Sequence, residues 1–290
     1  MIQLASKIFI DGGLPEETRA ASELMLKKFS RPLDGQTTNP SLIAKNLKSR
    51  MGNGQPVRLS QELALEEYKR IVKEMSSIIP KGSISIQVFA DQETKTDEML
   101  RQGRERTRWI PNASIKFPCS RPGLEAAEIA CKEFPINITL AFSQAQAAAV
   151  YEVTRGAKYP VFISPFVGRL DDRGENGMQV IANIKKLYAK GDRHVEILTA
   201  SVRTLDHFLY ALQLKSNIIT TPFKIFQEWA EGGYKLPDEK YKYDSKNLKP
   251  IPYEESIALG KNWKKYDLSH ELTDKGIDRF FLDWNEIIHL

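Results

Sequence analysis

Eight short runs of apolar and β-branched residues recur along this chain of 290 residues. Most begin about 23–34 residues apart, the length of one strand plus one helix, and a single interval of about 48 residues holds two helical patterns. The eight predicted strands are Lys7–Gly12, Gly35–Asn39, Ser83–Phe89, Ala113–Phe117, Ile136–Phe142, Val161–Val167, Val195–Val202 and Asn217–Pro222. This rhythm favours folds that repeat a strand–helix unit.

Segments with helical spacing of apolar residues fill the intervals between these strands. The predicted helices are Pro15–Phe29, Ser41–Leu47, Ser60–Met75, Gln92–Arg108, Pro122–Phe134, Gln144–Arg155, Gly177–Lys190, Thr204–Leu214 and Phe223–Ala230. Eight strand–helix units predict a (β/α)8 TIM barrel. A doubly wound open sheet is the alternative, and it is less favoured because no glycine-rich phosphate loop follows the first strand.

The C-terminal part of the chain departs from this rhythm. We predict a barrel over residues 1–232 and a separate arm with extra helices over residues 233–290. The segment Gly232–Ser256 is rich in Lys, Tyr and Pro and is predicted to be extended. Helices are predicted at Glu254–Trp263 and Thr273–His289, and the second has an apolar face. That face predicts packing on the barrel or on a neighbouring subunit, so a homo-oligomer stays open.

Composition narrows the class of protein. The net charge of +5 is a mild excess that suits an anionic small substrate, and no run is basic enough to predict a nucleic-acid partner. No signal peptide or long apolar span suggests export or a membrane partner. The two cysteines, Cys119 and Cys131, suit a reducing compartment. We therefore expect a cytoplasmic protein, and the four histidines lack the spacing of metal ligands, so no metal or cofactor is predicted.

The predicted strand at Asn112–Pro118 contains a lysine, Lys116, between Ile115 and Phe117. A strand covered on both faces would bury this amine, and burial lowers the pKa of a lysine. A partly neutral lysine can attack a carbonyl and form a Schiff base. Taken alone, the strand also allows a lysine that reaches solvent at the strand end.

The other predicted strands also end in polar residues. In a barrel of this kind the C-terminal ends of the strands carry the active site. The residues at these ends are Asp11, Asn39, Gln87, Asn137, Thr139, Ser164, Arg169, Ser201 and Arg203. Taken singly, Asp11 and Asn39 also suit turns, and Ser201 also suits a helix cap. Polar groups on so many strand ends are costly unless they form a site.

These residues lie in motifs by which the chain resembles the transaldolase family of class I aldolases. The motifs are Phe9-Ile10-Asp11, Thr37-Thr38-Asn39-Pro40-Ser41-Leu42-Ile43, Ile115-Lys116-Phe117-Pro118, Asn137-Ile138-Thr139-Leu140-Ala141-Phe142-Ser143, Ile163-Ser164-Pro165-Phe166-Val167-Gly168-Arg169 and Ala200-Ser201-Val202-Arg203. They follow the family's order over residues 7–230. The resemblance implies transfer of a dihydroxyacetone unit between sugar phosphates, as in the pentose phosphate pathway, with no metal and no cofactor.

The resemblance also implies a role for each matching residue. Lys116 would form the Schiff base with the C2 ketone, Asp11 would be the general base for the C4 hydroxyl, and Thr139 would hold a catalytic water. Asn39, Asn137 and Ser164 would bind substrate hydroxyls or orient the lysine, and Arg169, Ser201 and Arg203 would bind the phosphate. The implied substrates are of the fructose 6-phosphate, sedoheptulose 7-phosphate and erythrose 4-phosphate class.

Two positions depart from the family pattern. Transaldolases carry a glutamate where this chain has Gln87, whereas the fructose-6-phosphate aldolase branch has glutamine there together with a tyrosine at the position of Phe142. Phe166, in contrast, follows the transaldolase pattern. Glutamine can orient a water but cannot take up a proton near neutral pH. The alternatives are therefore an aldolase-type cleavage of fructose 6-phosphate, or a barrel that binds sugar phosphates with impaired catalysis.

Overall fold

In the computed structural model, which describes residues 4–51, 58–245 and 247–288, eight parallel strands form a closed barrel in sequence order. The strands are β1 (Lys7–Asp11), β2 (Gly35–Thr37), β3 (Ser83–Gln87), β4 (Ala113–Pro118), β5 (Ile136–Ala141), β6 (Val161–Pro165), β7 (Val195–Thr199) and β8 (Ile218–Thr221). The last strand closes the ring against the first, where Ile8 pairs with Ile219. The predicted (β/α)8 barrel is therefore confirmed.

Alternation along β3, β4 and β5 separates polar side chains that point into the barrel from apolar side chains that point outward. In β4, Ile115 and Phe117 are fully buried and lie against Gly103 of the covering helix. Ser114 and Lys116 occupy the alternate positions and therefore point into the barrel. The apolar residues attach the strands to the helices, so the interior is left free for polar side chains.

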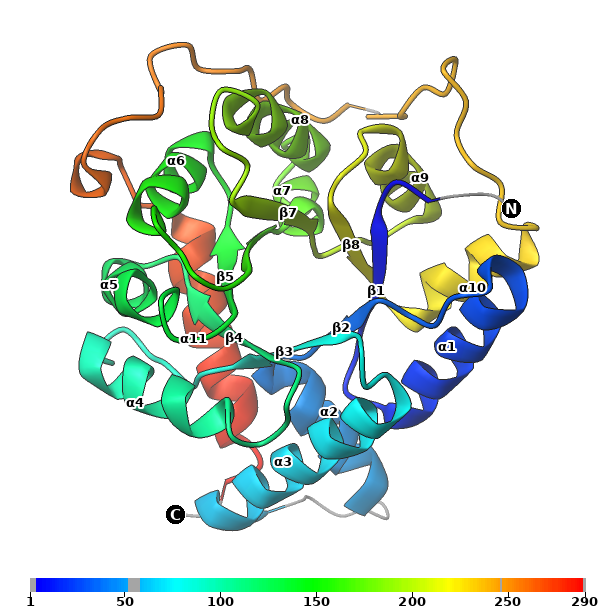
Figure 1. The fold of residues 1–290 in the computed structure, drawn as a ribbon, viewed down its shortest axis with the longest axis vertical. Helices are drawn as coiled ribbons and strands as arrows, with labels where there is room; N and C mark the ends of the chain where they lie inside the picture. Colours follow the sequence, from blue (N-terminus) through cyan, green and yellow to red (C-terminus); the bar gives the residue numbers. More distant parts are fainter. Residues whose placement is uncertain (1–3, 52–57, 246, 289–290) are drawn as a thin grey trace.

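The helices surround the barrel (Figure 1). They are α1 (Pro15–Phe29), α2 (Pro40–Met51), α3 (Gln61–Ile78), α4 (Thr96–Arg106), α5 (Arg121–Ala130), α6 (Gln144–Val153), α7 (Val167–Asp171), α8 (Gly177–Tyr188), α9 (Leu205–Gln213), α10 (Phe223–Glu231) and α11 (Glu271–Asn285), with a 3-10 turn η1 (Trp263–Lys265). Several begin where the sequence offers a cap. The hydroxyl oxygens of Ser120, Ser143 and Thr204 each accept a backbone N–H of the following first turn.

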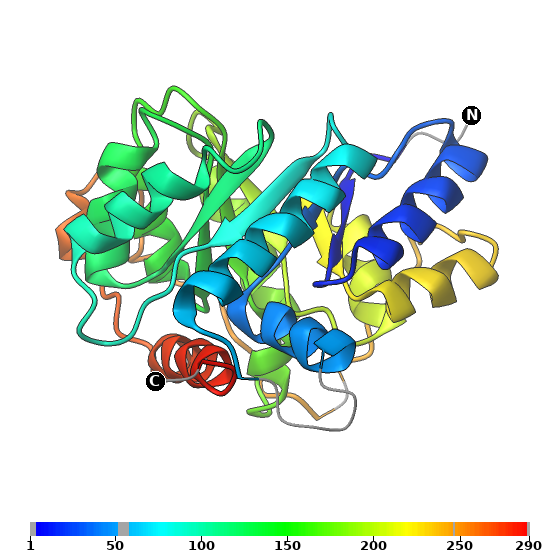
Figure 2. The same cartoon turned by 90° about the horizontal axis from the view of Figure 1, so that it is seen from below.

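Helix α11 lies across one end of the barrel, next to α2 (Figure 2). The Thr273 hydroxyl donates to the backbone oxygen of Leu140 at the end of β5, at 3.0 Å. The Trp284 ring stacks on Phe89, which follows β3, with 4.2 Å between the ring centroids. The apolar face of α11 is therefore buried against the barrel of its own chain, at the C-terminal ends of β3 and β5.

The predicted helix at Glu254–Trp263 is wrong, because residues 254–262 contain turns and bends but no helix, and the short turn η1 begins only at Trp263. The side chain of Gln144 binds the backbone oxygens of Glu254 and Ile257 and accepts the N–H of Glu254. These bonds, together with the turn in which the Glu254 backbone oxygen accepts the N–H of Ile257, hold the segment in an irregular conformation at the start of α6. Among its described residues the arm at 232–256 contains neither helix nor strand.

Three further points qualify the predictions. Helix α7 was not predicted, since five residues are too few to show a helical period. The predicted helix end at His289 lies outside the described residues, and the division of the chain at residue 232 stays a prediction. In the described part of the chain, no helix combines the length and the apolar character needed to cross a membrane.

Candidate active site

The amine of Lys116 lies inside the barrel. Gln87 on β3 and Asn137 on β5 pair in register with Lys116, so the three side chains point the same way. The lysine is 3% exposed, and its Nζ donates to the backbone oxygen of Thr38 at 2.9 Å. The alternative of a lysine that reaches solvent therefore does not hold. Burial lowers the pKa of Lys116 to about 8, an effect that Asp11 opposes and Arg169 reinforces.

The carboxylate of Asp11 belongs to the same interior. Its Oδ1 accepts the hydroxyl of Thr37 at 2.7 Å, and the Thr37 hydroxyl also meets that of Thr220 at 2.6 Å. Burial raises the pKa of Asp11, and the charge of Lys116 is the largest influence that opposes this rise. The carboxylate thus lies within electrostatic range of the amine and is held by a neighbouring strand.

A row of hydrogen bonds fixes the amide of Asn137. The Ser164 hydroxyl donates to Asn137 Oδ1 at 2.7 Å, and Asn137 Nδ2 donates to the hydroxyl of Ser85 at 3.1 Å. Both bonds are buried and link three strands, β3, β5 and β6. The row orients polar atoms beside Lys116 before any substrate binds.

Three buried polar atoms around Lys116 have no hydrogen-bond partner among the described residues: Gln87 Oε1, Ser114 Oγ and Thr139 Oγ1. They come from β3, β4 and β5, on either side of the lysine and on its own strand. Leaving such an atom without a partner costs about 1–3 kcal/mol. Gln87 Oε1 and Thr139 Oγ1 lie toward the C-terminal ends of the strands, as is typical of a site completed by water or by a polar ligand, whereas Ser114 Oγ lies two residues before the lysine, deeper in the barrel.

Two arginines lie toward β6 and β7. The guanidinium of Arg169 on α7 lies 5.2 Å from the ring centroids of both Phe166 and Phe280. Burial lowers the pKa of Arg169, and the nearby charge of Arg203 adds to this. The guanidinium of Arg203 is half-exposed and pairs with Asp172 at 3.0 Å. Two cations of this kind can bind a dianion.

The backbone between these arginines is tightly placed. Ser201 has a left-handed φ of 59°, and its backbone oxygen accepts the N–H of Gly168 at 3.0 Å. A Cβ on Gly168 would lie 2.3 Å from that oxygen and 2.4 Å from Cγ of Arg203, so only glycine fits. The alternative of Ser201 as a helix cap is wrong, because Thr204 caps α9.

Asn39 partly fits the alternative that it is a turn residue. Its Oδ1 accepts the N–H of Leu42 at 3.0 Å and so holds the first turn of α2. The Nδ2 of Asn39 remains as a donor for a ligand.

Sequence reasoning placed Thr37 at a strand end but gave it no role, although it binds Asp11, and it missed Phe280, which packs on Arg169. Thr37 precedes Thr38 at the end of a predicted strand, which was a usable signal. Phe280 lies on a helix far from Arg169 in the sequence, so no local pattern could have paired them.

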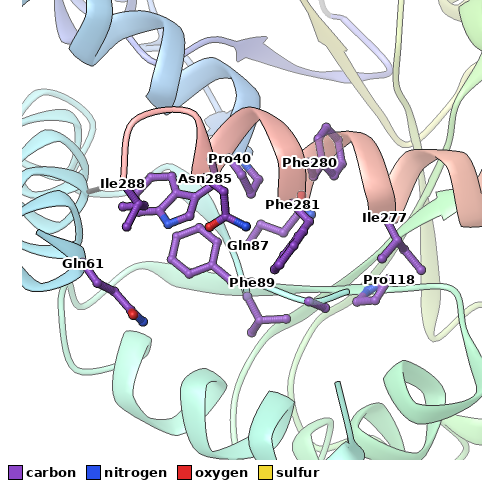
Figure 3. Close-up of a pocket in the computed structure, with 13 residues that line it drawn as sticks. Pro40, Gln61, Gln87, Phe89, Pro118, Ile277, Phe280, Phe281, Asn285 and Ile288 are labelled. Carbon is purple, nitrogen blue, oxygen red and sulfur yellow. The ribbon is translucent and has the colours of Figure 1, made fainter. Parts of the chain in front are cut away.

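A cavity of about 170 Å³ separates α11 from the ends of β3 and β4. Figure 3 shows Gln87 beside Phe280 and Phe281, with Phe89 and Pro118 nearby. Gln87 thus borders both this cavity and the amine of Lys116. Within the described ranges, no three His, Cys, Asp or Glu side chains group as metal ligands do.

Comparison with known proteins agrees with this geometry. The family model described as "Transaldolase/Fructose-6-phosphate aldolase" matches residues 8–290. A "Probable transaldolase" of Dehalococcoides mccartyi is 29% identical over 97% of this chain and 99% of its own length. Another of Moorella thermoacetica is 32% identical over 97% and 98%. One of Clostridium botulinum is 38% identical over 76% of this chain and 86% of its own. The chain therefore belongs to the transaldolase/fructose-6-phosphate aldolase family of enzymes.

Proposed function

We propose that this enzyme transfers a dihydroxyacetone unit from a ketose phosphate to an aldose phosphate through a Schiff base on Lys116. The observation that carries the proposal is a buried amine whose pKa lies near 8 and that has a carboxylate, Asp11, in its surroundings. At neutral pH about a tenth of such amines are neutral, against less than a thousandth for an exposed lysine.

The covalent steps need one nucleophile and one base. The neutral amine of Lys116 attacks C2 of the ketose to give a carbinolamine, which takes up a proton and loses water to give an iminium ion. Asp11 accepts the proton of the C4 hydroxyl, the C3–C4 bond breaks, and its electron pair neutralises the iminium to an enamine. The aldose phosphate leaves. An acceptor aldose phosphate then reverses the steps, with Asp11 returning the proton, and water hydrolyses the new iminium. The raised pKa of Asp11 makes its carboxylate a stronger base than that of an exposed aspartate, which favours the uptake of this proton.

In this proposal, Gln87 and Thr139 bind the water that takes part in the reactions at Lys116. Formation and hydrolysis of the iminium both pass through a carbinolamine, which must gain or lose a proton. The unpartnered Gln87 Oε1 and Thr139 Oγ1 are suited to hold a water there. Glutamine orients that water without taking its proton. We therefore expect slower exchange of protons than a carboxylate would give.

Substrate binding is divided between two groups of residues. Asn137 and Ser164 form the row that would meet the hydroxyls of the donor, and Asn39 has Nδ2 left for this task. The substrate phosphate would lie between Arg169 and Arg203, near the Ser201 hydroxyl, with Phe166 supporting the first arginine. Sugar phosphates of the fructose 6-phosphate, sedoheptulose 7-phosphate and erythrose 4-phosphate class meet both groups. The unpaired thiols of Cys119 and Cys131 support a reducing cytoplasmic setting.

A second candidate reaction is cleavage of fructose 6-phosphate to free dihydroxyacetone. Gln87 favours it, whereas the buried Phe142 offers no hydroxyl for the proton transfers. Release of dihydroxyacetone without an acceptor sugar would distinguish this cleavage from transfer. A barrel with impaired catalysis would bind the sugar phosphate with turnover in neither assay.

Borohydride trapping tests the central proposal. The protein is mixed with fructose 6-phosphate, reduced with borohydride, digested and analysed by mass spectrometry. We expect a reduced adduct on Lys116, its loss in Lys116→Met, and its retention in Lys7→Met, where the lysine removed is exposed. No adduct, or an adduct on another lysine, would contradict the proposed function.

A further inference from the structure

We propose that His207 and Asp171 form a positioning pair that holds the two phosphate-binding arginines in place. The inference rests on the proposed function, because it assumes that Arg169 and Arg203 bind the substrate phosphate. His207 lies on α9 and is 3% exposed, and Asp171 is the last residue of α7. Neither residue lies on a barrel strand.

The hydrogen bonds assign the proton of the imidazole. The backbone N–H of Arg203 donates to His207 Nδ1 at 3.3 Å, so Nδ1 carries no proton. The proton is then on Nε2, which lies 2.7 Å from Asp171 Oδ2 and donates to it. The neutral ring thus joins the backbone of one arginine to a carboxylate on the helix of the other.

Asp171 transmits this restraint to α7. It lies two residues after Arg169, and its Oδ1 accepts the N–H of Gly177 at 2.9 Å, which fixes the carboxylate from a second direction. On the other side of α7, the N–H of Gly168 already binds the backbone oxygen of Ser201. The histidine–aspartate contact therefore completes a second link between the segments that carry the two arginines.

The arm covers this pair. Tyr243 places its hydroxyl 3.1 Å from His207 Nε2 and donates to Asp171 Oδ2 at 3.3 Å. Its ring stacks on Tyr210 of α9, with 4.9 Å between the centroids. The arm thus supplies a second donor to the carboxylate and shields the pair from water, which strengthens both bonds.

A restraint of this kind acts on phosphate binding and not on the covalent steps. Arg203 is a long, half-exposed side chain, and ordering it on a phosphate costs conformational entropy. A fixed backbone reduces what must be ordered, so losing the pair weakens the complex with a phosphorylated sugar. Dihydroxyacetone, which has no phosphate, reaches Lys116 without using the arginines.

The test compares His207→Phe and His207→Gln with wild type. Phenylalanine keeps the ring and removes both bonds, and glutamine keeps a polar group if the first variant folds poorly. Binding of fructose 6-phosphate is measured by calorimetry, and imine formation on Lys116 is measured by borohydride trapping with fructose 6-phosphate and with dihydroxyacetone. We expect the Kd and the half-saturating concentration for fructose 6-phosphate to rise roughly 5- to 30-fold, the range for one or two lost hydrogen bonds. Trapping with dihydroxyacetone should not change.

Two variants of the arm supply the control. Tyr243→Phe removes the hydroxyl above the pair and should raise the half-saturating concentration of fructose 6-phosphate about threefold. Tyr241→Phe removes another bond between the arm and α9, that with Asp206, and should leave binding unchanged. An equal effect of both variants would overturn the inference, because it would point to the arm in general.

Failure of the inference and failure of the proposed function would give different experimental results. Unchanged binding of fructose 6-phosphate in a folded His207→Phe or His207→Gln would overturn the inference, as would an equal loss with dihydroxyacetone. Absence of any adduct on Lys116 in wild type would instead contradict the proposed function, while calorimetry would still report on the positioning pair.

Discussion

The two ends of the barrel differ in how the cations that line them are paired. At the N-terminal end, Lys7 pairs with Glu196 at 2.8 Å and Arg31 pairs with Asp34 at 3.1 Å. These pairs line a cavity of about 530 Å³. At the C-terminal end the cavity next to Gln87 is about 170 Å³. There, neither Lys116 nor Arg169 forms an ion pair with another described residue.

This difference shows that the larger cavity of the two is not the one that lies next to the candidate site. A buried cation without an anionic partner costs stability, whereas a paired surface cation is nearly neutral in free energy. Under the proposed function, an anionic sugar phosphate with a carbonyl group would contact both Lys116 and Arg169. Its binding would offset part of the cost of burying these two cations.

The largest contrast is expected between the two lysines. Lys116→Met should abolish transfer, by at least about 10⁴-fold in kcat, because no other group can form the imine. Lys7→Met removes only an exposed ion pair and should leave kcat within about twofold, with a loss of less than about 1 kcal/mol in the free energy of unfolding. A coupled assay of transfer and thermal unfolding measure both. Comparable loss of activity in the two variants would break the comparison.

The arginines give the next contrast. Arg169→Met removes a cation that would bind the phosphate and should raise KM for fructose 6-phosphate by roughly 10- to 100-fold. Arg31→Met, at the other end, should leave KM unchanged. Steady-state kinetics with both variants, and with inorganic phosphate as inhibitor, measure this. An unchanged KM in Arg169→Met would place the phosphate elsewhere.

A pH profile sharpens the comparison through the buried amine. Below the Lys116 pKa of about 8, the rate of imine formation should rise about tenfold per pH unit and then level off. Stability follows the same group. Its folded pKa lies below the unfolded value of 10.5, so the unfolded chain binds more protons between about 8 and 10.5, and stability should rise with pH across that window.

Lys116→Met should remove this part of the pH dependence of unfolding, and Lys7→Met should retain it. Denaturant titrations at about pH 7, 8, 9 and 10 would report how the free energy of unfolding changes with pH. The first value lies below the window, and the others cover about two pH units of it. Equal slopes in wild type and Lys116→Met would contradict the low pKa.

The smallest effect is expected at Gln87. Gln87→Glu supplies a carboxylate beside the unpartnered Thr139 hydroxyl and should raise the rate of transfer roughly tenfold through proton transfer to the water. The matched control is Gln61→Glu, which changes the same residue type in the lining of the same cavity, on the exposed surface of α3. A gain in Gln61→Glu as well would show that added negative charge alone is responsible.

Much of this architecture could be predicted from the sequence, because the burial of one face of a strand or helix requires apolar residues at regular spacing. The strand around Lys116 alternates polar and apolar residues, and the same alternation marks β3 and β5. Polar residues at strand ends gave Asp11, Asn137 and Ser164, which the structure brings into one interior. What the sequence alone could not predict are contacts made late in the chain. Phe280 on Arg169 and Tyr243 on His207 depend on how the C-terminal segments return to the barrel.

Helix α11 has a consequence for the order of events during synthesis. The ribosome makes all eight strands before it makes the residues of α11. Until that helix has been made, the strands lack the hydrogen bond from Thr273 to Leu140, the stacking of Trp284 on Phe89 and the packing of Phe280 on Arg169. The C-terminal ends of β3 and β5 therefore cannot be covered before the last helix of the chain is available.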